Sequence, residues 1–162
     1  MVRFLYGRLS RELRVSTEQN RFVIKDTIEN TGDREEPFEI LYHMNMGYPL
    51  LDEDSIIDIP SSEVRARNEH AKEDIANWMH MEKPTAGYEE RCYYHFFLND
   101  KGFASITQPK LGIKLAISYN AKALYWLTKF TAEISLTSIK RDAHGFGKEI
   151  CRLWRPESGA TH

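Results

Sequence analysis

One stretch between Pro37 and Glu53, PFEILYHMNMGYPLLDE, separates into two sets of side chains when it is read with a period of two. Successive side chains of a strand point to opposite faces, so this pattern predicts a β-strand with one face in a core. The core face would carry Phe38, Ile40, Tyr42, Met44, Met46 and Tyr48. The other face would carry Glu39, Leu41, His43, Asn45 and Gly47. A Gly-Tyr-Pro sequence then ends the strand, because proline has no N–H to donate to a neighbouring strand.

Other short segments alternate in the same way and are separated by Gly, Asn and Pro. This spacing predicts an all-β fold, an antiparallel β-sandwich. We expect Gln19–Glu29 and Pro37–Gly47 to form an antiparallel pair around the turn residues Asn30–Asp33. The remaining strands are expected at Val2–Tyr6, Leu13–Thr17, Ser55–Val64, Tyr88–Leu98, Phe103–Thr107, Leu111–Tyr119 and Ala123–Phe130, with a hairpin turn at Asn99–Gly102.

The segment Asn68–Met81 differs from the rest, because its alanines and charges predict one or two helical turns capped by Asn68. The chain of 162 residues is long enough for a single domain with a buried core. We expect one domain over residues 1–162 and leave the structure of residues 131–162 open.

Composition argues against several classes of function. A net charge of −2 provides no basic surface for nucleic acid, and no apolar run approaches the roughly 18 residues of a membrane span. Cys92 and Cys151 lack the spacing of a zinc site or a disulfide framework, and the N-terminus lacks the apolar region of a signal peptide. We therefore expect a cytoplasmic protein without a metal site.

Alternation through Tyr88–Leu98 places Glu89, Arg91 and His95 on one face of the expected strand. If His43 faces the same surface, the sheet presents two imidazoles, a carboxylate and an arginine among tyrosines and Trp126. Such groups suit proton transfer on a hydroxyl or ring oxygen, and the aromatic rings suit a sugar. Each residue also has a structural interpretation: a hydrogen-bonded histidine in a strand, a surface ion pair between Glu89 and Arg91, and tyrosines that pack in the core.

The motifs ENTGDREEPFEILYHMNMGYPLLDE and EKPTAGYEERCYYHFF resemble the aldose 1-epimerase-like branch of the galactose mutarotase superfamily. The resemblance covers about Phe22 to Lys129 and implies a β-supersandwich that binds a sugar on its concave sheet. It implies that His43 is the acid that protonates the ring oxygen, with a glutamate as the base. Five further residues match the motifs and would line or support the site: Tyr48, Asp52, Glu89, Glu90 and His95. Asn45, Arg91 and Trp126 are also expected to bind the sugar. Alternation favours Glu89 over Glu90 for facing His95, so Glu89 is the second catalytic candidate, and the base stays unassigned.

Two differences from the family shape the functional hypotheses. Full-length members are considerably longer, and their Leu-Glu-Pro segment, which bears the base, has no match here, although Glu133, Glu149 and Glu157 are available. The first hypothesis is an aldose 1-epimerase that exchanges sugar anomers without a cofactor. The second is a non-catalytic carbohydrate-binding or assembly module, and the third is a protein without a sugar ligand. We also expect a homodimer, because half of a supersandwich would leave open sheet edges.

Overall fold

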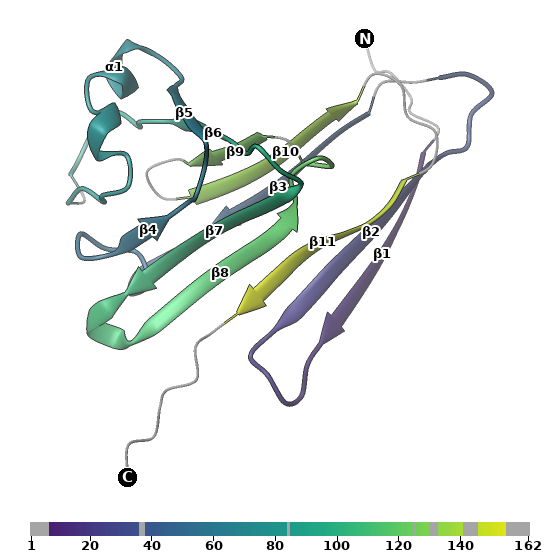
Figure 1. Ribbon diagram of the computed structural model, residues 1–162, viewed down its shortest axis with the longest axis horizontal. Coiled ribbons are helices and arrows are strands. Elements are labelled where there is room, and N and C mark those ends of the chain that lie inside the picture. The colour runs from purple at the N-terminus through teal and green to yellow at the C-terminus, as the bar shows by residue number, and fades with distance from the viewer. Residues whose placement is uncertain are drawn as a thin grey trace.

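The computed structural model describes residues 7–35, 38–83, 85–124, 126–129, 133–140 and 146–154, with the backbone alone at positions 38, 39, 126, 128, 133–140 and 146–154. Nearly all of the regular structure is β-strand, and every strand pair is antiparallel (Figure 1). The elements are β1 (Gly7–Val15), β2 (Phe22–Asn30), β3 (Phe38–Asn45), β4 (Ile56–Asp58), β5 (Glu63–Ala66), α1 (Glu69–Lys72), η1 (Ile75–Asn77), β6 (Tyr93–Phe96), β7 (Lys101–Gln108), η2 (Pro109–Leu111), β8 (Ile113–Asn120), β9 (Trp126–Lys129), β10 (Glu133–Lys140) and β11 (Phe146–Trp154).

The strands form two sheets. A six-stranded sheet has the order β1-β2-β11-β8-β7-β4, and a five-stranded sheet has the order β3-β10-β9-β6-β5. Strands that are consecutive in the chain often lie in different sheets, as β6 and β7 do. The expectation of an antiparallel β-sandwich is therefore confirmed, whereas the expected β6–β7 hairpin at Asn99–Gly102 is wrong, because β7 pairs with β8 and β4 instead.

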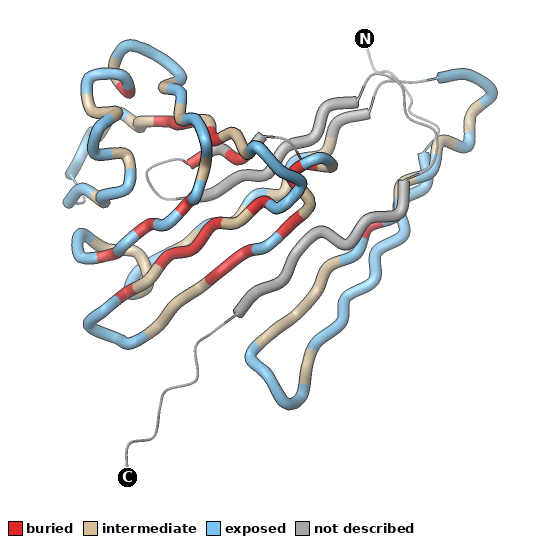
Figure 2. Tube along the Cα trace, in the orientation of Figure 1, coloured by how far each residue is buried: buried red, intermediate tan, exposed pale blue. Residues whose placement is uncertain are grey.

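The core lies between the two sheets and is densest over β7, β8 and β9, where Figure 2 shows most of the buried residues. The apolar alternation of β3 faces this core, because Ile40, Tyr42, Met44 and Met46 all pack against it. Tyr48 does not follow them: its side chain lies beyond the end of β3 and is 85% exposed. The buried cluster consists of Ile57, Ile59, Ala104, Ile106, Ile117, Tyr119, Ala121, Leu124 and Leu127.

The expected pairing of residues 19–29 with residues 37–47 is wrong. β2 pairs with β1 and β11, while β3 pairs with β10 in the other sheet. The two strands face each other across the core instead, and the buried carboxylate of Asp26 connects them. It accepts hydrogen bonds from the Arg11 guanidinium on β1 and from the Tyr42 hydroxyl on β3, so one buried charge joins three strands of both sheets.

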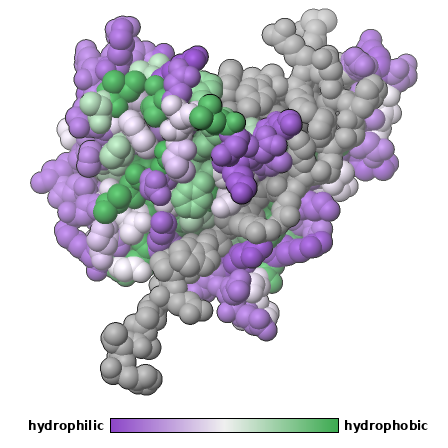
Figure 3. All heavy atoms as spheres, in the orientation of Figure 1, coloured by the Kyte–Doolittle hydropathy of each residue, from purple (hydrophilic) through white to green (hydrophobic). Residues whose placement is uncertain are grey.

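The helical segment forms where the sequence predicts it. Asn68 caps α1, and its side-chain oxygen accepts a hydrogen bond of 2.9 Å from the Ala71 N–H. Trp78 and Met81, just after η1, pack against the core. Polar side chains cover this segment and the β1–β2 hairpin, while hydrophobic side chains gather over the middle of the molecule (Figure 3). The expected strand Val2–Tyr6 lies outside the described residues.

Residues from 131 onward supply two strands that complete the sheets. β10 lies between β3 and β9, and β11 lies between β2 and β8. Without β10, the strand that carries His43 would have no neighbour, so the position of His43 depends on a segment whose sequence is not similar to the family motifs. No helix in the described part of the chain has the length and hydropathy that a membrane span requires.

Candidate functional site

His43 lies on the face of the five-stranded sheet that points away from the core, which we call the outer face. Its neighbours Tyr42 and Met44 pack inward, whereas Leu41, His43 and Asn45 are exposed. Strand alternation explains this division, since every second side chain of β3 must leave the core. The His–Asn pair therefore faces outward, as the sequence predicts.

The register places four further residues in line with His43 across the outer face. His43 pairs with Ser135, Ser135 with Thr128, Thr128 with Tyr94, and Tyr94 with Arg65. Four strand spacings of about 4.8 Å separate β3 from β5, so this row is about 19 Å long. It is long enough for a ligand of one or two sugar rings, and it begins at an imidazole and ends at a guanidinium.

A carboxylate-bearing residue occupies a position next to this row. Glu133 of β10 pairs with Asn45, two residues along β3 from His43. Diagonal neighbours of this kind in an antiparallel pair lie about 7–8 Å apart. Position 133 is therefore the nearest acidic position to His43 on the outer face of β10, and the sequence alone did not distinguish it from Glu149 and Glu157.

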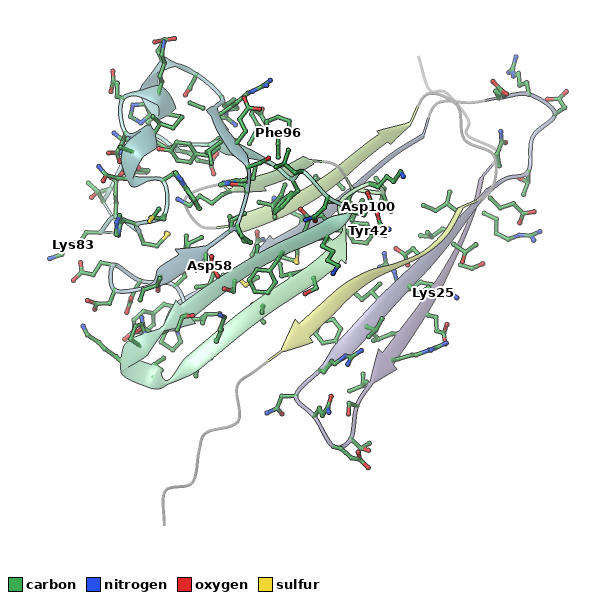
Figure 4. All side chains as sticks on the ribbon, viewed as in Figure 1. Lys25, Tyr42, Asp58, Lys83, Phe96 and Asp100 are labelled. Atoms are coloured by element: carbon green, nitrogen blue, oxygen red, sulfur yellow. The ribbon has the colours of Figure 1, made fainter. Side chains whose placement is uncertain are left out.

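The far end of the row is aromatic and charged. Tyr94 and Phe96 are half-buried on the outer face, and the Arg65 guanidinium lies 4.8 Å from the centre of the Phe96 ring. Glu63 accepts two hydrogen bonds from Arg65, at 2.6 and 3.0 Å, which lower the pKa of that carboxyl. Figure 4 shows Phe96 at this end of the sheet, close to β5. Sequence reasoning missed Arg65, although its alternation with Val64 and Ala66 indicated a strand face.

His95 lies on the opposite face from His43, so the two imidazoles do not share a surface. Its register partner is Leu127 of the core, and the side chain is completely buried. Its Nδ1 shares a 3.0 Å hydrogen bond with the Ser61 hydroxyl, and its ring meets Trp78 edge-on at 4.6 Å. Burial, together with the charge of Lys129, lowers the pKa of His95 to about 3. The imidazole is therefore neutral near pH 7 and does not act as a general acid there.

Glu89, Glu90 and Arg91 precede β6, which begins only at Tyr93, so the strand alternation expected for them does not apply. Glu89 is exposed, and its backbone carbonyl accepts a 3.1 Å hydrogen bond from His70 Nε2. Arg91 donates to Glu82 and to the Tyr88 hydroxyl, which fastens this loop beside η1. The described contacts bring neither glutamate to His43.

Beneath this loop lies a buried amine. Lys129 of β9 is 4% exposed, and its Nζ lies 5.5 Å from the centre of the Tyr93 ring. Burial lowers the pKa of Lys129 to about 8, against the opposing effect of the carboxylates of Glu82 and Asp74. Both Lys129 and Tyr93 belong to the inner face of the sheet, so this amine is separated from the outer face by the sheet itself.

The remaining predicted residues occupy other environments. Asp52 is held in a turn, where it accepts hydrogen bonds from the Asp54 N–H and the Gln108 amide. Trp126 lies on β9 with Thr137 as its register partner, next to the row that contains His43. Among the described residues, no group of His, Cys, Asp and Glu side chains is arranged to hold a metal ion.

Residues 2–134 match the model of a family described as a domain of unknown function, DUF4432. The chain belongs to this family. A comparison with curated proteins finds no match. The fold is similar to that of a Klebsiella pneumoniae protein described as a "putative aldose 1-epimerase", with a TM-score of 0.81 and 18% sequence identity. That similarity covers 92% of this chain and 46% of the other, so this chain spans about half the length of the solved protein. The DUF4432 chain thus has an aldose 1-epimerase-like fold.

Proposed function

We propose that the outer face of the five-stranded sheet binds a carbohydrate. The observation that supports this most directly is the register row from His43 to Arg65, which combines hydrogen-bonding groups with the ring of Tyr94 and has Phe96 two residues away on the same face of β6. Aromatic faces pack against the C–H groups of a sugar, and polar groups fix the orientation of its hydroxyls. The fold of the solved Klebsiella protein supports the same function at the level of analogy.

We further propose that the bound sugar exchanges its anomers, with His43 as the acid and Glu133 as the base. The base removes the proton of the anomeric hydroxyl while His43 donates a proton to the ring oxygen, and the bond between the anomeric carbon and the ring oxygen breaks. The carbonyl group that forms then rotates and is attacked on its other face by the same oxygen, which returns its proton to His43. The protonated base at the same time returns its proton to the carbonyl oxygen, which becomes the anomeric hydroxyl again. No electrons are gained or lost in the cycle, so it requires no cofactor.

The register positions of these two residues support this proposal. The anomeric hydroxyl and the ring oxygen are bonded to the same carbon, so acid and base must converge on a space a few ångströms wide. Positions 43 and 133 are diagonal neighbours about 7–8 Å apart, a separation that two side chains of this length span. The same argument disfavours Glu89, which lies in the loop before β6, and His95, which lies on the other face.

A non-catalytic carbohydrate-binding module is the second candidate. The observation that favours it concerns Glu63, the carboxylate of the outer face whose side chain is described. It lies on β5, four strand spacings or about 19 Å across the sheet from β3 and two residues beyond the row, and it accepts hydrogen bonds from Arg65. If position 133 does not supply the base, the face retains the groups that bind a sugar and lacks the pair that would convert it.

The binding proposal is tested by titrating aldoses into isotope-labelled protein and following the NMR signals of its side chains. We expect shifts at outer-face positions, among them Leu41, His43, Tyr94 and Arg65, and no comparable shifts at inner-face positions such as Tyr93 and His95. His43→Ala is expected to weaken binding, and His80→Ala provides the matched control, because His80 is an exposed histidine outside this face. Shifts confined to the inner face, or no shifts with any aldose, would contradict the proposal.

A further inference from the structure

Among the described strands, β1 is an edge of the six-stranded sheet. Its one described partner is β2, and all nine of its residues are exposed (Figures 1 and 2). An edge strand of this length offers unpaired backbone N–H and C=O groups to another strand. Three of its inward-facing positions are apolar as well: Leu9, Leu13 and Val15 are 55%, 59% and 69% exposed. They continue the partly buried apolar row of β2, whose register partners for them are Ile28, Ile24 and Phe22.

The hydrogen-bond pattern shows which residues of β1 point their backbone groups outward. The Ser16 N–H donates to the Arg21 carbonyl at 2.9 Å, next to the register pair Val15–Phe22. Hydrogen-bonded and non-bonded pairs alternate along an antiparallel ladder. The odd-numbered residues of β1, which include Leu13, therefore point their N–H and C=O groups away from β2. Their side chains face inward, and those of Leu9, Leu13 and Val15 are apolar.

We propose that β1 pairs with β1 of a second copy of this chain, antiparallel and centred on Leu13. In this arrangement Leu13 lies opposite Leu13 of the copy, and Arg11 lies opposite Val15 of the copy. Both are pairs of odd-numbered residues, so they would exchange backbone hydrogen bonds. The six-stranded sheets of the two copies would then join into one, with both apolar faces on the same side.

Charge selects this register over its neighbours. Centring on Leu13 places each Glu12 opposite Arg14 of the copy, in non-hydrogen-bonded pairs where side chains approach most closely. Centring on Glu12 would oppose two glutamates, and centring on Arg11 would oppose Arg8 with Arg14. Within one chain the Arg14 Nε already donates to Glu12 at 2.6 Å, which lowers the pKa of that carboxyl. In the pair of copies each Glu12 would lie between two arginines.

The first test is the mass in solution. The chain of 18.9 kDa is expected to sediment at twice its mass at micromolar concentration. Leu13→Lys, which would place two ammonium groups opposite each other, is expected to raise the dissociation constant about tenfold or more. Leu98→Lys is the matched control, because Leu98 is 92% exposed and follows β6 of the five-stranded sheet, whereas β1 belongs to the six-stranded sheet. A monomeric wild-type chain, or a dimer that Leu13→Lys leaves intact, overturns the proposal.

The second test examines the register by charge exchange. Glu12→Arg alone and Arg14→Glu alone would each oppose like charges in a self-pair, so each variant is expected to be monomeric. An equal mixture of the two is expected to form a mixed dimer, since every opposed pair then has opposite charges. In the mixture each chain still lacks the Glu12–Arg14 contact within its own strand. If that intrachain contact were all that the two residues contribute, mixing the variants would not restore the dimer. Failure of the mixture to dimerise overturns the register.

The third test is a disulfide at the two-fold axis. Hydrogen-bonded residues of an antiparallel pair have Cα atoms about 5.5 Å apart, within the range that a disulfide bridges. Leu13→Cys is therefore expected to give a covalent dimer on mild oxidation. Leu9→Cys is expected to remain monomeric in a denaturing gel, because the two copies of position 9 would lie eight residues apart along the strands. Equal cross-linking of both variants would contradict the proposed pairing.

Discussion

The buried ion pair between Arg11 and Asp26 makes the most quantitative prediction. The two side chains are joined by two hydrogen bonds of 2.7 Å, from Nε to Oδ1 and from Nη2 to Oδ2. The carboxylate is fully buried, whereas the guanidinium is 51% exposed. Arg11→Ala would therefore leave a buried carboxylate with the Tyr42 hydroxyl as its remaining described donor.

The magnitude follows from this unequal exposure. Removing one partner of a buried ion pair costs about 3–5 kcal/mol, whereas exposed pairs contribute about 0–1 kcal/mol. Water can enter the space that the half-exposed guanidinium leaves, so we place the loss at the lower end of the buried range, about 3 kcal/mol. Asp26→Asn in the Arg11→Ala background is expected to recover part of this loss, because a neutral amide is less costly to bury than a charge.

Urea unfolding at pH 7, at one fixed protein concentration, measures the loss, with Arg8→Ala as the control. Arg8 lies on the same strand and forms a 3.2 Å pair with Glu29, but both side chains are more than half exposed, so its loss should stay below about 1 kcal/mol. The pKa of Asp26 is lowered chiefly by the hydrogen bonds from Arg11. The stability that this pair contributes is present above the unfolded-state pKa of the carboxyl and is lost as pH falls through the folded-state pKa. Equal losses for Arg11→Ala and Arg8→Ala would refute the reasoning.

Three further predictions concern groups in the core. The pKa of His95 falls from 6.5 to about 3 on folding, so the unfolded chain takes up the proton first as the pH is lowered. Between pH 6.5 and 5, the free energy of unfolding measured in urea should therefore fall by up to about 2 kcal/mol more in the wild type than in His95→Gln. The pKa of Lys129 falls from 10.5 to about 8, so between pH 8 and 9.5 the stability of the wild type should rise by about 2 kcal/mol relative to that of Lys129→Met. Gly102→Ala should lower the stability by about 1–3 kcal/mol in thermal denaturation, because its Cβ would overlap the buried Tyr119 ring, whereas Gly47→Ala meets nothing within 4 Å. Equal pH slopes in the wild type and in His95→Gln or Lys129→Met, or equal melting of the two alanine variants, would contradict these assignments.

Strand faces could be predicted from the sequence because alternation is a local property. Ile40, Tyr42 and Met44 all point into the core, as their period of two requires. Asp26 interrupted the apolar face of β2 in the sequence, and the reason is tertiary. Its partners Arg11 and Tyr42 come from one strand before it and one after it, in different sheets.

Strand partners could not be predicted, because alternation gives the two faces of a strand but not which neighbour it pairs with. β2 and β3 are close in sequence, yet each pairs with a strand from the C-terminal region, β11 and β10. For the same reason the sequence could not tell whether His43 and His95 lie on the same face of a sheet, and the register shows that they lie on opposite faces. Position 133 gained its place beside Asn45 only through the pairing of β10 with β3.

Anomer exchange by magnetisation-transfer NMR, on a panel of neutral and anionic aldoses, tests the central proposal most directly. The wild-type chain should accelerate exchange between α and β anomers of at least one sugar, His43→Ala and Glu133→Gln should both abolish the acceleration, and His80→Ala should retain it. Acceleration that survives His43→Ala would contradict the assignment of the acid. No acceleration of any sugar by the wild-type chain would contradict catalysis on the outer face and leave carbohydrate binding there as the function to test.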